Sequence, residues 1–231
     1  MINWRVRILN LILRRFFYLL YNPLALTYDL VSALVSLGMW KDWILTPQSY
    51  LTGPIILELG HGTGHLQRAL LSKFSHANVP AGKVYKIFGL DASTQMGLVT
   101  IRRLKKENLP YRLVRARSQS IPFPTGYFDQ VIATFPSEYI FAEDTISEIA
   151  RVLKPAGWAV ILPQAQITGK KGLQRLAAWL FRITGQAVEA DKIWRTFVQQ
   201  PFFLAGFETN TEEIFLPTSK IQLILAKKAK I

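Results

Sequence analysis

The sequence predicts an α/β fold with a mostly parallel sheet flanked by helices, and two observations support that prediction. At 55–64 an apolar run ends in three alternating glycines, as Ile-Ile-Leu-Glu-Leu-Gly-His-Gly-Thr-Gly. This pattern indicates a buried parallel strand that enters a tight turn, and residues 65–71 continue as a helix. Further apolar runs at 84–91, 128–135 and 158–162 alternate with helical patterns. A strand, a glycine turn and a helix in this order are typical of the nucleotide site of a doubly wound sheet.

Size and composition allow one domain, or one domain with an appendage. At roughly 150 residues per domain, the 231 residues suit that range. The absence of cysteine excludes disulfides, thiolate metal ligands and cysteine nucleophiles. The net charge of +13 favours anionic partners, either nucleic acid or an anionic membrane, without choosing between them. No carboxylate completes a ligand set with the three histidines, so no metal site is expected.

The first part of the chain predicts a helical extension over 1–50, ahead of a main domain over 51–231. Residues 3–21 place large apolar side chains on one face of a helix and arginines mainly on the other. That pattern is typical of a helix lying in a membrane interface, and equally of a helix packed on the domain. The arginines interrupt the apolar run well short of the ~20 residues that a spanning helix needs. The short apolar stretch also makes a poor signal peptide.

The glycine turn narrows the choice of ligand. Gly60, Gly62 and Gly64 let the backbone turn sharply and approach a ligand closely, and the helix N-terminus behind them favours an anionic group. The spacing G-x-G-x-G differs from the dinucleotide fingerprint and from the Walker A loop. The acid before the first glycine, Glu58, belongs to neither phosphate-binding pattern. A plain glycine turn without a ligand is the alternative.

The E-x-G-x-G-x-G arrangement resembles motif I of the class I S-adenosylmethionine-dependent methyltransferases. This resemblance implies a Rossmann-like sheet of seven strands, S-adenosyl-L-methionine as the cofactor, and the methionine end of that cofactor at the turn. The residues that the motif implies as cofactor contacts are Glu58, Gly60, His61, Gly62 and Gly64.

A narrower resemblance lies ahead of the glycine turn. The UbiE-like methyltransferases of quinone biosynthesis (the methyltransferase type 11 domain) open with Tyr-Asp, a short helix, Ser-x-Gly and a tryptophan. In such enzymes this segment helps to cover the active site. The matching residues of this sequence are Tyr28, Asp29, Ser36, Gly38 and Trp43.

The second predicted strand, 84–91, ends in Asp91. A carboxylate at this position can accept hydrogen bonds from both ribose hydroxyls of a nucleoside. The alternative is that Asp91 caps the following helix, a role for which Ser93 competes. The resemblance implies that Ala92, Ser93 and Met96 pack on the adenine of the cofactor.

The segment after the third predicted strand, 111–117, departs from the family pattern. Ser-Gln-Ser-Ile-Pro-Phe at 118–123 resembles the family's D-A-x-x-L-P-F, whose acid binds the adenine amino group. Here Arg117 stands in the place of that acid. Contact with adenine therefore falls to backbone, to Ser118 or to Gln119, while Arg117 could stack on the base or point away.

The fourth predicted strand ends at Phe135, which we expect to contact the cofactor. Because ligands of open α/β sheets bind beyond the carboxyl ends of the strands, the following Pro-Ser-Glu-Tyr faces the transferable methyl group or its acceptor. Glu138 or Tyr139 could orient or deprotonate an acceptor hydroxyl, or could merely pack against the next helix. The segment lacks the Asn/Asp-Pro-Pro-Tyr of many enzymes that methylate nucleobases, which lowers the case for a nucleobase substrate.

A helical segment follows the fifth predicted strand and is expected to be a lid over the substrate pocket. Apolar residues recur at helical spacing within 164–200, with lysines and arginines around them. The lid could face a membrane, or the segment could be a simple surface helix. The last predicted strand is 221–226, followed by a basic tail.

These observations predict an S-adenosylmethionine-dependent methyltransferase that acts on a small apolar acceptor, such as a quinone precursor or a lipid. Its expected location is the cytoplasm, with peripheral contact at an anionic inner membrane face. The net charge of +13 motivates an alternative, an RNA or protein methyltransferase. Arg117 motivates another, a methyltransferase fold that binds its ligand without catalysis.

Overall fold

The computed structural model describes residues 25–75, 84–169, 172 and 192–230. Seven strands form one sheet in the order β3-β2-β1-β4-β5-β7-β6. Strand β7 runs antiparallel to β5 and β6, and the remaining pairs are parallel. The bounds are β1 Ile55–Leu59, β2 Lys86–Asp91, β3 Leu113–Arg115, β4 Phe128–Thr134, β5 Leu153–Ile167, β6 Phe207–Leu216 and β7 Ser219–Lys228. The predicted seven-stranded, mostly parallel sheet is confirmed.

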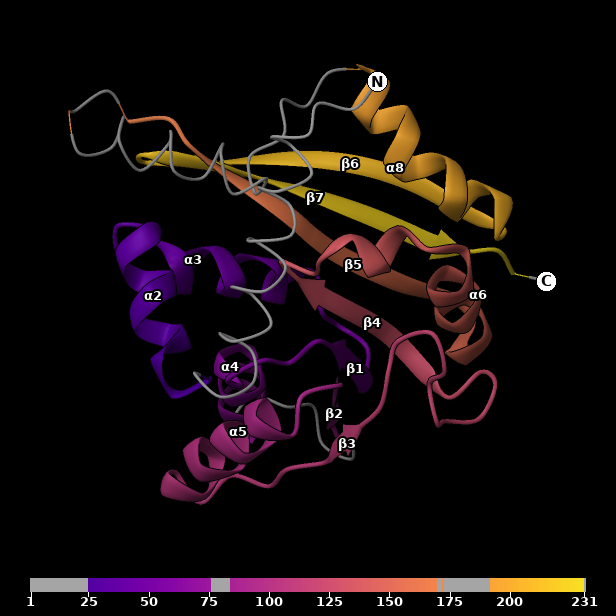
Figure 1. Ribbon diagram of the computed structural model, residues 1–231. Helices are drawn as coiled ribbons and strands as arrows, with labels where there is room; N and C mark the ends of the chain where they lie inside the picture. The colour runs from indigo at the N-terminus through magenta and orange to yellow at the C-terminus, as the bar shows by residue number, and fades with distance from the viewer. Residues whose placement is uncertain (1–24, 76–83, 170–171, 173–191, 231) are drawn as a thin grey trace, which may run out of the picture.

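The helices cover both faces of the sheet (Figure 1). One face packs against α3, α4 and α5, and the other against α6 and α8. Neighbouring residues of a strand therefore enter opposite cores: Ile56 joins the first and Leu57 the second, as the two-residue period of a strand requires. The bounds are α2 Tyr28–Val35, α3 Trp40–Leu45, α4 His65–Ser75, α5 Thr94–Lys106, α6 Glu143–Val152 and α8 Lys192–Leu204. Three short 3₁₀ helices complete them: η1 Ala25–Thr27, η2 Thr46–Tyr50 and η3 Glu138–Phe141.

The chain order places a ligand position at the centre of the sheet. From β1 the chain moves outward through β2 to β3, and it then returns to the other side of β1 with β4. This reversal is the topological switch point of an open α/β sheet, where ligands bind beyond the carboxyl ends of the strands.

The second part of the predicted helical extension forms α2 and α3. Ser36 and Gly38 make the turn between them: the Trp40 amide donates to Ser36 Oγ at 2.9 Å, and Gly38 has a φ of 83°. Trp43 is fully buried, and its Nε1 donates to Ser219 Oγ, at the start of β7, at 2.8 Å. The Ser-x-Gly and tryptophan pattern thus anchors α3 to the sheet.

Two predicted boundaries were wrong. Strand β5 continues to Ile167 because residues 164–167 pair with β7, so the segment expected to form a lid does not begin at 164. Residues 192–200 belong to α8, which packs on β6 and α6, with Val198 and Phe202 buried there. The remainder of that predicted lid, and the predicted helix at 3–21, lie outside the described residues.

No helix in the described part of the chain combines the length and the apolar character needed to cross a membrane.

Candidate functional site

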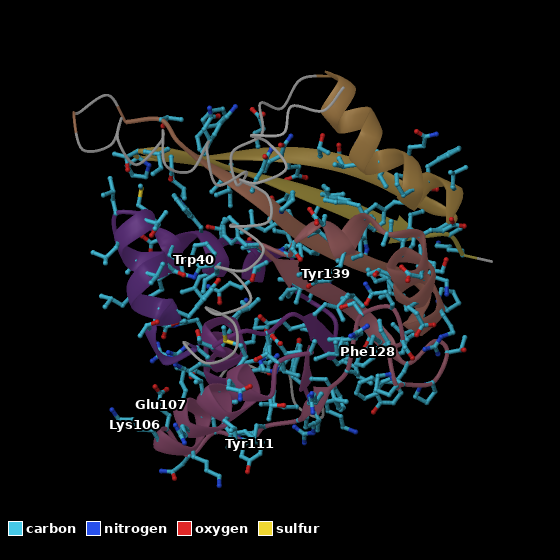
Figure 2. All side chains as sticks on the ribbon, viewed as in Figure 1. Trp40, Lys106, Glu107, Tyr111, Phe128 and Tyr139 are labelled. Atoms are coloured by element: carbon cyan, nitrogen blue, oxygen red, sulfur yellow. The ribbon has the colours of Figure 1, made fainter. Side chains whose placement is uncertain are left out.

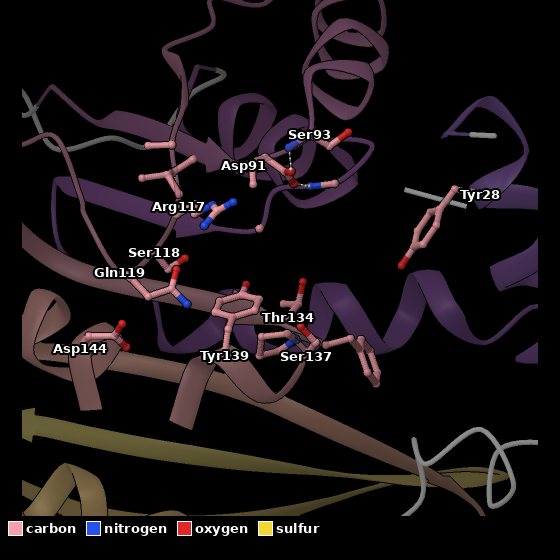
Figure 3. A pocket seen from close by; sticks show the side chains of 17 residues that line it. Tyr28, Asp91, Ser93, Arg117, Ser118, Gln119, Thr134, Ser137, Tyr139 and Asp144 are labelled. Carbon is pink, nitrogen blue, oxygen red and sulfur yellow. Dashed lines mark hydrogen bonds between the residues drawn. The ribbon is translucent and has the colours of Figure 1, made fainter. Parts of the chain in front are cut away.

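A cavity of about 780 Å³ opens at the switch point, beyond the carboxyl ends of β1, β2, β3 and β4 (Figure 3). Each of these strands contributes the residues that follow it, and α2, η3 and α6 add one side chain each. The lining residues are Tyr28, Gly60, Gly62, Leu90, Asp91, Ala92, Ser93, Ala116, Arg117, Ser118, Gln119, Thr134, Phe135, Pro136, Ser137, Tyr139 and Asp144.

The glycine turn after β1 is held between β2 and α5. The Gly60 amide donates to Leu90 O at 2.7 Å, so the turn begins against the end of β2. Gly64 has a φ of 79°, and a Cβ there would lie 2.5 Å from Cγ2 of Thr100 on α5. A Cβ on Gly60 would lie 2.8 Å from the Tyr139 hydroxyl. Glycine is therefore required at Gly64 for packing, and at Gly60 it leaves room for Tyr139 at the cavity wall.

Asp91 joins the glycine turn to the end of β2. Its carboxylate accepts the Gly62 amide at 2.9 Å through Oδ2 and the Ser93 amide at 2.8 Å through Oδ1 (Figure 3). Two carboxylate oxygens offer about four lone-pair positions, so acceptor capacity remains for two further donors. Ser93, rather than Asp91, caps α5, because its Oγ accepts the Met96 amide. Asp91 therefore fits a pair of ribose hydroxyls facing the cavity.

Glu58 lies behind the turn and does not line the cavity. It is fully buried in β1, and Gln67 Nε2 donates to its Oε2 at 2.8 Å. Burial raises the pKa of Glu58 to about 8, the Gln67 hydrogen bond opposes that rise, and the charge of Asp91 adds to it. At neutral pH the carboxyl group is therefore mostly protonated, and it supports the turn as a neutral hydrogen-bonding group.

Replacing Glu58 by glutamine is expected to remove a pH dependence of stability. Glu58 holds its proton in the folded chain up to about pH 8, whereas in the unfolded chain it ionises near 4.5. The folded state therefore binds more protons across that window, and its free energy of unfolding falls by about 1.4 kcal/mol per pH unit as the pH rises. Denaturant unfolding of both proteins across this pH window should show that the free energy of unfolding of Glu58→Gln rises relative to that of wild type as the pH increases. A difference that does not change with pH would contradict the assignment.

Three further residues predicted to contact the cofactor also lie outside the lining. His61 is buried with Nδ1 3.0 Å from Gly62 O and 3.3 Å from Thr100 Oγ1, and burial lowers its pKa. Gly64 packs on Thr100, and Met96 is buried in α5. The predicted contacts that do line the cavity are Gly60, Gly62, Asp91, Ala92, Ser93, Ser118, Gln119 and Phe135.

The two predicted catalytic residues differ in their position relative to the cavity. Tyr139 lines the cavity, whereas Glu138 is exposed and outside the lining. Ser137 lines the cavity within the segment 136–139 that was predicted to face the acceptor, although no role was assigned to it. Thr134, at the end of the fourth strand, was not predicted as a site residue. Asp144 reaches the cavity from the first turn of α6, and for that residue the sequence offers no local signal.

Helix α2 is tied to the glycine turn through Asp29. This carboxylate accepts Thr63 Oγ1 at 2.6 Å, lies 3.1 Å from His65 Nε2 and pairs with Arg103 of α5. Partial burial alone would raise the pKa of Asp29, but hydrogen bonds from His65, Thr63 and Arg103 bring it well below its ordinary value. These contacts of Asp29 position Tyr28, the preceding residue, at the mouth of the cavity.

An aromatic wall closes the cavity beside α2. Phe135 follows β4 with a φ of 46°, a left-handed conformation that costs a non-glycine residue about 1–2 kcal/mol. In this conformation its ring stacks on Trp40 of α3 at 4.3 Å between centroids, and Trp40 meets Tyr28 edge to face at 6.1 Å. Figure 2 shows Trp40 on α3 and Tyr139 near the centre of the molecule. The apolar side of the cavity is thus formed by Tyr28 of α2, Phe135 after β4 and Tyr139 of η3, and Trp40 of α3 packs against Phe135.

The loop that carries Ser118 and Gln119 is held from behind by α6. Glu148 accepts the Ile121 amide at 2.6 Å, and Arg151 donates to the carbonyls of Ile121 and Phe123 at 2.7 and 2.8 Å. The hydrogen bonds from Arg151 lower the pKa of Glu148. Phe123 also packs edge to face on Phe128 at 5.0 Å, at the start of β4. This side of the cavity is therefore a fixed wall.

The described residues contain no cluster of histidine and carboxylate side chains suited to a metal ion. The polar groups of the cavity instead suit a nucleoside: a carboxylate with spare acceptor capacity, a glycine turn and hydroxyl side chains.

Comparison with known proteins agrees with this geometry. Residues 56–157 match a family model described as a methyltransferase domain. A ubiquinone/menaquinone biosynthesis C-methyltransferase UbiE from Chromobacterium violaceum is 28% identical over 151 residues, which cover 64% of this chain and 59% of that protein. The UbiE of Coxiella burnetii is 29% identical over 148 residues, covering 62% and 56%. The chain thus matches a little over half the length of these relatives.

Solved structures share the fold. A candidate S-adenosyl-L-methionine-dependent methyltransferase from Methanococcus maripaludis superimposes with a TM-score of 0.62 at 18% identity, covering 89% of this chain and 92% of that one. A geranyl diphosphate C-methyltransferase from Streptomyces coelicolor A3(2), solved with Mg²⁺, geranyl diphosphate and S-adenosyl-L-homocysteine, gives 0.57 at 13% identity, covering 80% and 77%. With the strand order, the glycine turn and the matched methyltransferase domain, these findings support a class I S-adenosylmethionine-dependent methyltransferase with a UbiE-like core.

Proposed function

We propose that this protein transfers a methyl group from S-adenosyl-L-methionine to a small lipophilic acceptor, such as a quinone precursor. The observation that carries the proposal is the division of one cavity into two chemically different ends. Asp91, Ser93, Ser118 and Gln119 form a polar end, whereas Tyr28, Phe135 and Tyr139 form an aromatic end. A nucleoside suits the first end and an apolar ring suits the second.

The polar end has the groups that the cofactor requires. Asp91 accepts the ribose hydroxyls while its bonds to Gly62 and Ser93 hold it in place. The backbone at Gly60 carries no side chain, so the methionine end of the cofactor can approach it. When bound, S-adenosyl-L-methionine supplies a methyl group on a sulfonium centre. The protein contributes position and the exclusion of water.

The aromatic end supports a lipophilic acceptor. Stacked and edge-to-face rings bury apolar surface and favour a flat partner. The names of the UbiE relatives refer to ubiquinone and menaquinone, whose precursors have such rings. Of the two predicted catalytic residues, Tyr139 is the one retained, because its hydroxyl faces the turn at Gly60 inside the cavity. Its proposed role is to orient an acceptor hydroxyl by hydrogen bonding.

We further propose that the acceptor arrives from an anionic membrane at the cytoplasmic face. Leu30 and Leu34 lie one turn apart on α2 with 62% and 66% of their surface exposed. The same helix carries Tyr28 to the mouth of the cavity, and the chain has a net charge of +13. Exposed leucines and a basic protein suit contact with anionic lipid, and this contact would place the cavity mouth near a dissolved quinol.

Transfer of a labelled methyl group from S-adenosyl-L-methionine to a quinol that lacks one ring methyl group tests the proposal. We expect turnover that is faster with anionic vesicles than with zwitterionic ones. The double variant Leu30→Glu/Leu34→Glu should lose most of that advantage, because two added charges oppose apolar and electrostatic contact. The matched control is Phe203→Glu/Leu204→Glu on α8, where two equally exposed apolar residues lie outside the cavity lining.

Three results would contradict the proposal in different ways. Equal rates on both vesicle types, with unchanged rates in the α2 variant, would refute delivery of the acceptor from the membrane but not the methyl transfer itself. Labelling of RNA or protein instead of quinol would replace the lipophilic acceptor with a macromolecule. Tight binding of the cofactor product without turnover on any acceptor would indicate a binding protein.

A further inference from the structure

We propose that Arg117 determines how this site recognises the base of its cofactor, by offering hydrogen-bond donors where the family pattern offers a carboxylate. The wild-type site would then not select the exocyclic amino group of adenine, and it would accept a 6-oxopurine nucleoside equally well. The inference rests on the proposed function, because it assumes that the polar end of the cavity binds the nucleoside of the cofactor.

The position of Arg117 places it beside the expected base of the cofactor. Beyond Asp91, the cavity is lined by Ala92, which follows β2, and by Ser118 and Gln119, which follow β3. A nucleoside held by its ribose hydroxyls at Asp91 directs its base into this space. Arg117 follows β3 and lines the same space, and Figure 3 shows its guanidinium group among the lining side chains near Asp91 and Ser118.

The backbone around Arg117 is fixed while its side chain is available. The Ala116 amide donates to Asp91 O at 3.2 Å, and the Ser120 amide donates to Arg117 O at 3.0 Å. Over the described residues, by contrast, the guanidinium group makes no hydrogen bond or ion pair. A guanidinium group has five N–H donors and no acceptor. It can therefore donate to ring nitrogens or to a carbonyl of the base, but it cannot accept from an amino group.

The carboxylates that line the cavity do not replace the missing acid at this position. Asp91 accepts hydrogen bonds from the Gly62 and Ser93 amides, and its remaining acceptor positions are assigned to the ribose hydroxyls. Asp144 lines the cavity from the first turn of α6, where its Oδ1 accepts the Thr145 amide at 2.8 Å. Figure 3 shows Asp144 beyond Gln119, on the far side of that residue from Arg117. Asp144 is nevertheless the side chain that could provide an acceptor for an amino group, so the test includes it.

Arginine recognises the carbonyl and N7 of a 6-oxopurine through paired hydrogen bonds, whereas a carboxylate facing that carbonyl is repelled. The two arrangements therefore predict different selectivities. A site with the family acid should favour the 6-amino base, and the site with Arg117 should not.

Calorimetric titration with S-adenosylhomocysteine and with its 6-oxo analogue, S-inosylhomocysteine, tests the proposal on three forms of the full chain. Wild type should bind both ligands within about threefold of each other. Arg117→Asp restores the family acid and should disfavour the 6-oxo ligand by at least about tenfold relative to the 6-amino ligand. Asp144→Asn should keep the wild-type ratio.

The proposal is overturned if wild type already disfavours the 6-oxo ligand by more than about tenfold, or if Arg117→Asp keeps the wild-type ratio. A changed ratio in Asp144→Asn would assign base recognition to Asp144 instead. Because Arg117 is exposed, its replacement should not alter folding, which thermal unfolding of the variant checks. Failure of wild type to bind either ligand would refute the proposed function, and the inference with it.

Discussion

Replacing Asp91 by alanine is expected to weaken S-adenosylhomocysteine binding by about 2–4 kcal/mol, which is ~30-fold to ~1000-fold in the dissociation constant. The variant loses the acceptor for the ribose hydroxyls. It also loses the hydrogen bonds from the Gly62 and Ser93 amides, which join the glycine turn and the start of α5 to the end of β2. Both losses act on the same binding step, so their effects combine. Calorimetric titration of wild type and variant measures the change directly.

The matched control removes a carboxylate elsewhere in the chain. Asp42 is exposed on α3 and does not line the cavity, so Asp42→Ala should bind like wild type. Thermal unfolding separates the two consequences at Asp91, because loosening of the turn lowers stability in the absence of ligand, whereas loss of ribose contacts does not. An unchanged dissociation constant for Asp91→Ala would show that Asp91 does not hold the ribose, whereas failure of wild type to bind would refute the proposed cofactor.

Replacing Gly64 by alanine is expected to destabilise the fold by about 2–4 kcal/mol. Its φ of 79° lies in the left-handed region, which costs an alanine about 1–2 kcal/mol. The new Cβ would also lie 2.5 Å from Thr100 Cγ2, and overpacking of this kind typically costs about 1–3 kcal/mol. Urea unfolding of wild type and variant provides the measurement.

A second substitution separates these two causes. Thr100→Ala removes the Cγ2 and Oγ1 atoms that the new Cβ would meet, so the double variant should recover part of the loss in a double-mutant cycle. The strain from the positive φ should remain. Gly97 lies within α5 with nothing close to its Cβ position, so Gly97→Ala should be neutral or slightly stabilising. A Gly64→Ala protein as stable as wild type would show that the turn and α5 can move apart at no cost in free energy of unfolding.

The local elements of the fold could be predicted from the sequence because each depends on a short pattern. The apolar run and glycines at 55–64 predicted β1 and its turn, and the strand ending in Asp91 predicted the acid at the end of β2. A helical stretch was predicted to begin at Tyr28 and to end near the Ser-x-Gly and tryptophan pattern, where the structure has the turn between α2 and α3. Strand and helix periods, turn chemistry and the position of an acid relative to a strand end all act within a few residues.

Burial and long-range partners were decided only by the tertiary structure. Glu58 was predicted beside the cofactor, yet it is buried in β1, and this burial raises its pKa to about 8 although the hydrogen bond from Gln67 lowers it. Asp29 contacts Thr63 and His65, at the glycine turn and the start of α4, and Arg103 of α5. The length of β5 depends on its pairing with β7, whose strand lies more than fifty residues further along the chain. A periodic pattern indicates which face of an element is apolar, but not which element packs against that face. The solvent exposure of a carboxylate likewise depends on how distant elements pack around it.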